Sequence, residues 1–463
     1  MNRRQFLKTA VVAAGVPVLS VPRIFADQAT PPKLRIAIIG CGGQGRSNHV
    51  PVAVRQRLVA LVDPDENYLS KALQRAREIE PTTDTSQIKT FMDYRKMFDV
   101  MGKELDAVII AAQNHHHFLP AMMAMKLRIP VYLEKPLCHN IAETRALAAA
   151  ARQYRIPTQM GNQGYSTESC RRLCEYIWAG AIGNITAVYT WCNRANGGTG
   201  PRPPSEPVPA GMHWDSWIGP APYRDFHADL HPHEWHNWRD FGNGSLGNMG
   251  CHILGSVHWA LRLGHPTSIE AGPINGGNDE RNPVGAQVCW EYPARGDMPP
   301  VKVYWYDGIR PGTEDAGARK SDKKTRNHPP LVTELEEKFK RDFGSNGALY
   351  VGDKGYMVTG TYGDGVRIVP ESQHQAYPPP PKTLPRVVGS HHDDFFRACR
   401  GEGTACSNFD VAAPLNEMIL LGCLAIRAGT GRKVEWDGPN MRCANIPKLN
   451  QYLQRDNRAG WSV

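Results

Sequence analysis

The sequence of 463 residues lacks the patterns that mark several common classes of protein. No internal apolar run is long enough to span a bilayer, and no dense basic run carries interleaved aromatic residues, although the formal net charge is +9. We therefore expect neither a membrane span in the mature chain nor binding to nucleic acid. There is no internal repeat, and the 11 cysteines show no zinc-ligand spacing. The composition, with 41% hydrophobic and 21% charged residues, is typical of a soluble globular protein, and the length favours two domains.

The first 29 residues have the pattern of an export signal. Residues 2–8 read NRRQFLK, and a short apolar stretch, residues 9–20, follows the paired arginines. This order resembles a twin-arginine signal peptide, and cleavage near Ala26 or Ala29 would release a periplasmic or extracellular protein. A cytosolic chain with a basic tail is the alternative. Because the twin-arginine route carries folded proteins, we expect the cysteines to be mostly free and buried.

A glycine-rich turn follows the first apolar run. Residues 36–45 read IAIIGCGGQG, in which Gly40, Gly42 and Gly45 form G-x-G-x-x-G. The first glycine permits a tight turn, the second lets a pyrophosphate approach, and the third lets the next helix pack on the strand. The helix N-terminus then offers N–H groups to the phosphates. This order predicts a dinucleotide site, unless the domain has lost its cofactor.

An acidic residue ends the second apolar run, LVALVD. Asp63 lies 18 residues after Gly45, where its carboxylate can accept both hydroxyls of a ribose. A carboxylate repels a 2′-phosphate, so we expect NAD rather than NADP, and Arg46 leaves NADP possible.

The remaining pattern divides the mature chain into two parts. Residues 33–160 alternate short apolar runs with helical stretches, as parallel sheets covered by helices do. Residues 161–463 contain strands that alternate apolar and polar residues, as sheets with one wet face do. The expected strands are 34–39, 58–62, 107–111, 131–133, 156–160, 185–192, 268–271, 286–292 and 301–306, and the expected helices are 120–127, 141–154, 167–179, 394–399 and 412–428. The polyproline stretch 378–381 is typical of a stiff connector.

Three short segments carry candidate chemistry. LEKPL, residues 133–137, follows a strand, so Lys135 can point at a nicotinamide and stabilise an alkoxide or join a proton relay. A lysine in a surface turn is the alternative. AAQNHHH, residues 111–117, follows another strand and offers Asn114 and His117 to the cofactor, whereas consecutive loop histidines point apart and do not suit a metal. NMGCH places Asn248 and His252 on one helix face, where His252 is either a general base or a core histidine.

These segments, in this order, resemble the Gfo/Idh/MocA oxidoreductase family over nearly the whole mature chain. The resemblance implies a Rossmann domain, 33–160, followed by a substrate and dimerisation domain, 161–463, with an open, mostly antiparallel sheet. The final segment of that domain could pack back on the first. It implies a homo-oligomer and hydride transfer between NAD(P) and a carbon of a sugar or cyclitol. It also implies that Lys135 is the lysine of the family's EKP motif and His252 the histidine of its D-x-x-x-H motif.

Two positions depart from the family pattern. Asn248 replaces the acid of D-x-x-x-H, and an amide can orient a hydroxyl but cannot take up its proton. Acid–base chemistry therefore falls to His252 and Lys135. The common Thr-Pro before the position of Asn114 is Ala112-Gln113 here.

The Asn-x-x-x-His segment also resembles the NAD-dependent glycosidases of glycoside hydrolase family 109. Those enzymes oxidise a sugar hydroxyl, eliminate the aglycone, add water and reduce the carbon again. That cycle regenerates NAD, which suits an exported enzyme without an external NAD pool.

Residues 212–238 contain five histidines and four tryptophans. Tryptophan faces stack on sugar C–H surfaces and histidines hydrogen-bond hydroxyls, so we predict a carbohydrate subsite from His231, His233, Trp235 and His236. Plain loop packing and a metal site formed by the three histidines are the alternatives, and we expect no metal.

The sequence thus predicts an α/β protein that is an exported NAD(P)-dependent oxidoreductase acting on a sugar or glycoside. A redox-neutral glycosidase or lyase is the second hypothesis, and a non-catalytic binding protein is the third. The predicted catalytic residues are Lys135, His252 and Asn248, and the predicted cofactor contacts are Gly40, Gly42, Gln44, Gly45, Asp63, Asn114, His117, Glu134, Lys135 and Asn162.

Overall fold

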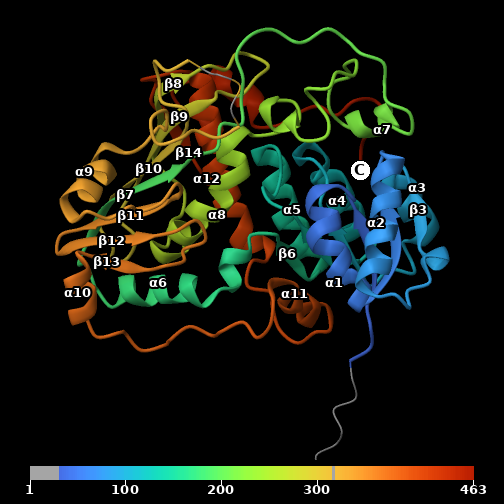
Figure 1. The fold of residues 1–463 in the computed structure, drawn as a ribbon, viewed down its shortest axis with the longest axis horizontal. Coiled ribbons are helices and arrows are strands. Elements are labelled where there is room, and N and C mark those ends of the chain that lie inside the picture. Colours follow the sequence, from blue (N-terminus) through green and yellow to red (C-terminus); the bar gives the residue numbers. More distant parts are fainter. Residues whose placement is uncertain (1–30, 315–316, 318) are drawn as a thin grey trace, which may run out of the picture. The chain divides into compact units, whose positions relative to one another are not determined.

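The structure is a computed structural model that describes residues 31–314, 317 and 319–463. The export signal expected at residues 1–29 lies outside the described residues. Residues Leu34–Val463 form one compact unit, which contains two sheets (Figure 1).

The first sheet is built from six parallel strands in the order β3-β2-β1-β4-β5-β6. Its strands are β1 (Arg35–Ile39), β2 (Arg57–Val62), β3 (Lys89–Phe91), β4 (Ala107–Ile110), β5 (Val131–Leu133) and β6 (Thr158–Met160). The sequence pattern did not predict β3, because this edge strand has three residues and none of them is buried. The carboxyl ends of β1, β2, β4 and β5 therefore meet at one edge, where parallel sheets bind their ligands.

Helices cover this sheet and begin at polar caps. They are α1 (Val50–Arg55), α2 (Glu66–Ile79), α3 (Tyr94–Met101), α4 (Phe118–Lys126) and α5 (Ile141–Tyr154). Side chains of Asp65, Asp93 and Asn140 accept backbone N–H groups at the starts of α2, α3 and α5. A π-helical turn, Gly45–His49, leads into α1. Pro51 has no N–H to donate and would clash with the carbonyl four residues earlier, which accounts for the widened turn.

The second sheet has nine strands in the order β13-β12-β11-β7-β10-β9-β8-β14-β15. All its pairings are antiparallel except that of β7 with β10, so the predicted α/β class with a mostly antiparallel second sheet is confirmed. The strands are β7 (Ile185–Cys192), β8 (Ser268–Asn275), β9 (Gly285–Tyr292), β10 (Val301–Gly308), β11 (Gly347–Gly352), β12 (Gly355–Thr359), β13 (Arg367–Val369), β14 (Val434–Asp437) and β15 (Arg442–Cys443).

Two long apolar helices, α8 (Gly244–Ala260) and α12 (Phe409–Ala428), pack on each other and on this sheet. By length and composition α12 could cross a membrane, with a mean hydropathy of 1.6, which corrects the expectation that no internal run is long enough. In the structure 72% of its apolar window is buried within the protein, as in a core helix. It is the only helix of this kind in the described part of the chain. The other helices of this half are α6 (Glu168–Trp178), α7 (Trp214–Ile218), α9 (Pro330–Phe339), α10 (Glu371–Ala376) and α11 (His391–Cys399).

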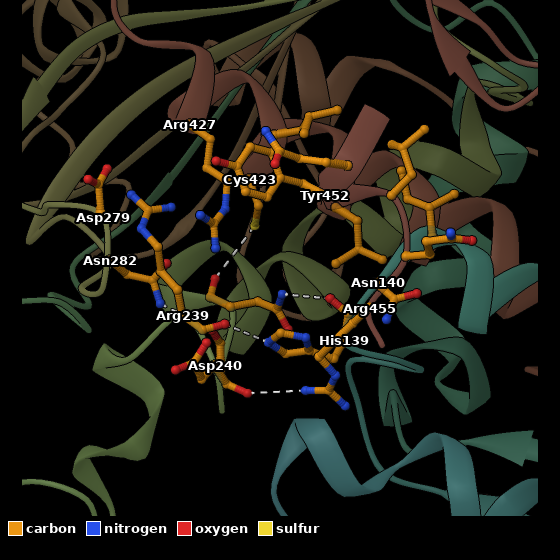
Figure 2. Close-up of a pocket in the computed structure, with 18 of the residues that line it drawn as sticks. His139, Asn140, Arg239, Asp240, Asp279, Asn282, Cys423, Arg427, Tyr452 and Arg455 are labelled. Atoms are coloured by element: carbon orange, nitrogen blue, oxygen red, sulfur yellow. Dashed lines mark hydrogen bonds between the residues drawn. The ribbon is translucent and has the colours of Figure 1, made fainter. Parts of the chain in front are cut away.

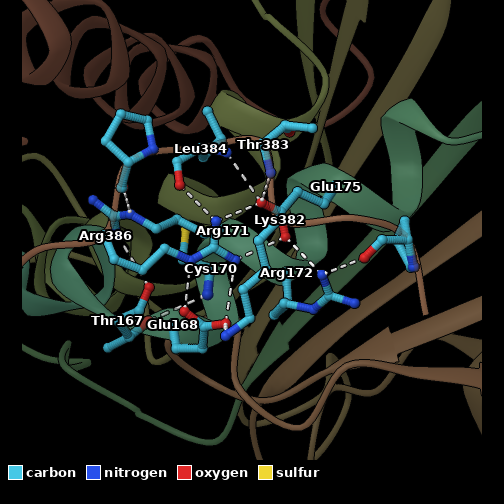
Figure 3. Close-up of polar contacts among 12 residues, drawn as sticks. Thr167, Glu168, Cys170, Arg171, Arg172, Glu175, Lys382, Thr383, Leu384 and Arg386 are labelled. Carbon is cyan, nitrogen blue, oxygen red and sulfur yellow. Dashed lines mark hydrogen bonds and ion pairs between the residues drawn. The ribbon is translucent and has the colours of Figure 1, made fainter.

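The chain returns to the first sheet through residues 377–390, which we call the return segment. Arg386 forms ion pairs with Glu168 and Glu175 of α6, and Arg172 donates to Glu175 and to a backbone carbonyl of the return segment (Figure 3). After α11, the backbone N–H of Met160 donates to Ser407 O at 2.9 Å, and α12 packs on α5. The last part of the chain thus lies against both sheets.

Candidate active site

The turn after β1 has room only for glycine at two positions. Gly40 has φ +89°, and a Cβ there would lie 2.5 Å from the backbone of Ala111. A Cβ on Gly45 would lie 1.8 Å from the carbonyl oxygen of Gly40. The backbone therefore folds back tightly at the end of β1 and leaves a cradle of the kind that holds a pyrophosphate.

A pocket of about 190 Å³ opens over this turn. Four predicted cofactor contacts line it, namely Gly40, Gly42, Gln44 and Asp63. Its other walls include Tyr68, Tyr94, Gln113, His116, Pro232, His233, Trp235, His236 and Trp461. Sequence reasoning missed Tyr68 and Trp461, because no motif marks an aromatic residue as a pocket wall.

Asp63 lies at the end of β2, as predicted, and is 6% exposed. One carboxylate oxygen accepts the backbone N–H of Cys41 at 2.7 Å, and the other accepts that of Asp65 at 2.9 Å. Burial raises the pKa of Asp63 to about 7, against the opposing effect of these hydrogen bonds. Each oxygen keeps a further lone pair that can accept a hydroxyl. Asp63 can therefore accept hydrogen bonds from the hydroxyls of a ribose, and its charge changes with pH near neutrality.

Lys135, just beyond β5, reaches across to α8. Its ammonium donates to the side-chain oxygen of Asn248 at 2.9 Å and to the backbone oxygen of the same residue at 3.0 Å. The Asn248 amide donates in turn to Asn196 at 2.9 Å. Burial lowers the pKa of Lys135, while the charge of Glu134 opposes that change. The predicted EKP lysine and the predicted Asn248 are thus brought together.

His252 lies one helical turn after Asn248 on α8 and is 9% exposed. Burial and the charge of Lys135 lower the pKa of His252 to about 3, so the imidazole is neutral at physiological pH. Its Nδ1 is buried and finds no hydrogen-bond partner among the described residues, and its ring meets that of Tyr362 edge-on at 5.0 Å. The neutral imidazole has a lone pair that can accept a proton, but its lowered pKa makes it a weak base in the protein without ligand.

A buried polar network surrounds Glu134, the residue before Lys135. Glu134 contacts Nε2 of His49 at 3.1 Å, and Nδ1 of His49 contacts Nε2 of His392 at 2.9 Å. Burial alone would raise the pKa of Glu134, but the hydrogen bond and charge of His49 and the charge of Lys135 lower it to about 2. His392 stacks on Tyr132 at 4.8 Å. No sequence pattern predicted this network, because its two histidines lie 343 positions apart.

Six of the ten predicted cofactor contacts do not line the pocket, namely Gly45, Asn114, His117, Glu134, Lys135 and Asn162. The side chains of three of them are engaged by other protein groups. His117 is 1% exposed, and its ring nitrogens lie 2.7 Å from Pro136 O and 3.0 Å from Ala112 O. Asn114 donates to Asn243 at 3.1 Å, and Asn162 accepts from Ser407 at 2.5 Å. His117 therefore fastens the loop that carries Lys135 to the loop after β4, and its ring is engaged by protein atoms.

Residues 212–238 lie along the dinucleotide pocket, and their four predicted subsite residues divide into two groups. His233, Trp235 and His236 line the pocket itself. His231 contacts the carboxylate of Asp65 at 3.2 Å, two residues from Asp63. The segment is joined to the start of α2 by backbone hydrogen bonds, from Glu66 N to Gly211 O and from His213 N to Pro64 O. Its position makes it a cover of the dinucleotide pocket.

Among the described residues, no group of three or more His, Cys, Asp or Glu side chains is placed so that it could hold a metal ion. All 11 cysteines are free, and seven of them are buried.

Comparison with known proteins gives two matches to models of one oxidoreductase family. Residues 34–161 match its NAD-binding Rossmann fold, and residues 180–287 match its C-terminal α/β domain, so that together the matches span just over half of the chain. Among curated relatives, the rhizopine catabolism protein MocA of Rhizobium meliloti is 25% identical over 156 residues, 34% of this chain and 46% of that protein. An uncharacterised oxidoreductase of Synechocystis is 23% identical over 233 residues, 49% of this chain and 51% of that protein. The chain thus spans about half the length of these relatives, or less.

Solved structures share the fold over most of the chain. The WlbA dehydrogenase from Bordetella pertussis, in complex with NADH and UDP-GlcNAcA, has a TM-score of 0.56 at 14% identity, covering 87% of this chain and 99% of that chain. The aldose-aldose oxidoreductase from Caulobacter crescentus has a TM-score of 0.55 at 15% identity, covering 87% and 100%. Levoglucosan dehydrogenase, in complex with NADH and levoglucosan, has a TM-score of 0.53 at 16% identity, covering 87% and 99%.

Proposed function

Because the chain belongs to the Gfo/Idh/MocA family of NAD-binding oxidoreductases, we propose that it transfers hydride at a hydroxyl-bearing carbon of a sugar or glycoside. The observation that carries this proposal is the contact between Lys135 and Asn248, with His252 one turn further along the same helix. This contact joins the carboxyl edge of the parallel sheet to the second half of the chain. The sugar class is supported by the ligands of the structural neighbours and by the aromatic and imidazole groups of residues 233–236.

The residues that would hold NAD fit it. Gly40, Gly42 and Gln44 form the cradle for the pyrophosphate, and Asp63 offers carboxylate oxygens to the ribose. NAD, when bound, supplies the hydride acceptor at its nicotinamide. A second carboxylate, Asp65, lies beside Asp63 and adds to the repulsion of a 2′-phosphate, which supports NAD over NADP.

The reacting hydroxyl would lie between Lys135, Asn248 and His252. Lys135 donates a charge-assisted hydrogen bond to the oxygen as negative charge develops on it. His252 is neutral and takes the hydroxyl proton. Asn248 orients the hydroxyl through its amide, since it has no proton to exchange at neutral pH.

A specific observation supports a second candidate, a redox-neutral cycle such as that of a glycosidase or lyase. Pro232, His233, Trp235 and Trp461 wall the dinucleotide pocket, so the cofactor would leave slowly. An enzyme that keeps its NAD needs a cycle that restores it, or a partner that does. The paired arginines near the N-terminus support export to the periplasm, where such retention would be useful.

The test starts from the full-length chain purified with the NAD it carries, which mass spectrometry identifies. A panel of sugars and glycosides is then followed by absorbance of reduced nicotinamide and by release of aglycone. Net reduction of NAD supports the oxidoreductase, and aglycone release without it, with solvent deuterium entering the carbon next to the oxidised one, supports the redox-neutral cycle. Lys135→Met should abolish either activity, whereas the control Lys126→Met, an exposed lysine of α4, should not. Absence of both activities across the panel, or full activity in Lys135→Met, would overturn the proposal.

A further inference from the structure

A second cavity, of about 530 Å³, shares no lining residue with the dinucleotide pocket (Figure 2). It lies where the N-terminal ends of α5 and α8 approach the C-terminal half of α12, and residues 451–456 close one side. Tyr452 at its rim is 43% exposed, so the cavity is open to solvent. Nothing in the proposed reaction uses it.

Two arginines face this cavity without a carboxylate partner. Arg239 donates through Nε to the carbonyl oxygens of Asn278 at 2.9 Å and Arg281 at 3.0 Å, and no hydrogen bond of its terminal nitrogens occurs among the described residues. The guanidinium of Arg427 lies 4.5 Å from the ring centre of Tyr452 and likewise has no ion pair in the described part of the chain. Figure 2 shows the two groups turned toward each other.

The repulsion between the charges of Arg239 and Arg427 lowers the stability of the protein without a bound ligand. Burial and the charge of Arg427 lower the pKa of Arg239 to about 10, and burial also lowers the pKa of Arg427. Two half-buried guanidinium groups repel each other, and this repulsion destabilises the protein unless other contacts offset it. A bound anion between the two groups would remove the repulsion. Arg455 also lines the cavity, but one of its terminal nitrogens lies 3.6 Å from a carboxylate oxygen of Glu143. Its two terminal nitrogens donate to the carbonyl oxygens of Asp240 at 3.3 Å and His115 at 3.2 Å.

Among the described residues the carboxylates of the cavity form no ion pair with Arg239 or Arg427, and the nearby charge of Asp279 offsets only part of the lowering of their pKa values. Asp240 pairs with Arg224 instead, and Asp279 and Asp456 are exposed at the rim. The polar groups between the arginines and the first half of the chain are amides and imidazoles. Asn243 donates to His139 O at 3.1 Å and accepts from Asn114 at 3.1 Å, so the wall of the cavity is bonded to the loop after β4.

We propose that this cavity binds a small polyanion, through phosphate or carboxylate oxygens that bridge Arg239 and Arg427. The planar fork of each guanidinium matches such oxygens two at a time. The site is separate from the proposed hydride-transfer site, so the proposal does not depend on that reaction.

The test uses the full-length chain saturated with NAD, so that added anions cannot enter the dinucleotide pocket. Binding of inorganic phosphate, pyrophosphate and citrate is measured by calorimetry and by the shift in melting temperature. We expect at least one of them to bind at millimolar concentration or below, more weakly as the NaCl concentration rises. Preference for pyrophosphate over citrate would identify a phosphate ligand, and the reverse a carboxylate ligand.

Variants separate this site from general charge. Arg427→Gln should weaken binding about tenfold or more, because a charge-assisted hydrogen-bonded pair is lost, and Arg427→Lys should restore part of it. Arg432→Gln, which removes an exposed charge beyond the end of α12, should bind as the unmodified protein does. Arg427 makes no side-chain hydrogen bond in the described part of the chain, so its variants should fold. Failure of all three anions to bind, or equal binding by Arg427→Gln, would overturn the proposal.

Discussion

The affinity for NAD should depend on pH through Asp63. Burial raises the pKa of this carboxyl to about 7 in the free protein. Ribose hydroxyls donate hydrogen bonds to a carboxylate more strongly than to a neutral carboxyl, so binding should favour the ionised form and release a proton. The affinity should therefore rise with pH and level off above about pH 7.

The size of the effect follows from the ionised fraction. A carboxyl with a pKa of about 7 is ionised in roughly one molecule in a hundred at about pH 5 and in roughly nine in ten at about pH 8. If only the ionised form bound NAD, the affinity would rise by up to about 100-fold over this interval. Two imidazoles that line the pocket, those of His116 and His236, do not imitate this effect, since burial lowers the pKa of His116 to about 4 and that of His236 well below its usual value.

The raised pKa of Asp63 should have the opposite effect on the stability of the protein without NAD, which should decrease as the pH rises. The folded state holds the proton of Asp63 more tightly than the unfolded chain does. The free energy of unfolding should therefore fall as the pH rises from about 4 to about 7. A protein that loses stability with pH while it gains affinity for NAD would show both consequences of one buried carboxyl.

Calorimetry of NAD binding at several pH values, in buffers of different ionisation enthalpy, measures both the affinity and the proton released. Asp63→Asn should give a flat pH profile and no proton release. Asp65→Asn is the matched control: it removes the neighbouring charge that helps to raise the pKa of Asp63, so the rise should persist at slightly lower pH. An affinity that is constant or falls between about pH 5 and 8, or an Asp63→Asn variant that keeps the slope, would refute the reasoning.

Three further predictions concern the support of the site. His49→Phe removes the imidazole that contacts one oxygen of the buried Glu134 carboxylate, whose other oxygen accepts the backbone N–H of Lys135. The free energy of unfolding should fall by about 3–5 kcal/mol in denaturant melts, and a loss below about 1 kcal/mol would contradict this. Arg386→Ala should cost about 1–3 kcal/mol above about pH 4.5, and the difference should vanish as the pH falls toward 2, because the pair lowers the pKa of Glu175 to about 2; a deficit independent of pH would argue against the pair. Trp461→Ala should speed release of NAD about tenfold or more in stopped-flow displacement, and an unchanged rate would show that the C-terminal tail does not retain the cofactor.

Local pattern predicted the first half of the fold well because its strands are short, buried and apolar. The expected strand 131–133 and helix 141–154 have those bounds in the structure, and the acid at position 63 directly follows β2. Six strands escaped prediction, namely β3, β11, β12, β13, β14 and β15. Three of these, β3, β13 and β15, are edge strands of two or three residues, which leave no period to read. Pairing of β7 with β10 could not be foreseen either, because 108 residues of loops and other elements separate the two strands.

The site divides in the same way. The role of Gly40 and Gly45 depends on the local backbone turn, so the spacing of the glycines was enough to predict it. Residues that act through a distant partner do not: Asn114 and His117 follow a strand, as cofactor ligands do, yet their side chains bond Asn243 and the carbonyl of Pro136. Chain order alone could not distinguish these two outcomes.

The dinucleotide pocket is complete only when both ends of the described chain have come together. Gly40 forms its floor and Trp461 part of its wall. Two arginines help to hold the tail that carries Trp461. Arg95 lies 3.7 Å from the centre of the indole ring and donates to Gly460 O at 2.7 Å. Arg458 pairs with Asp215 of α7 and donates to Gly219 O at 3.0 Å. A ligand that binds only the completed pocket stabilises everything that completes it. Binding of NAD and docking of the tail should therefore be thermodynamically coupled. Removing the tail should weaken the binding of NAD, and removing NAD should destabilise the docked tail.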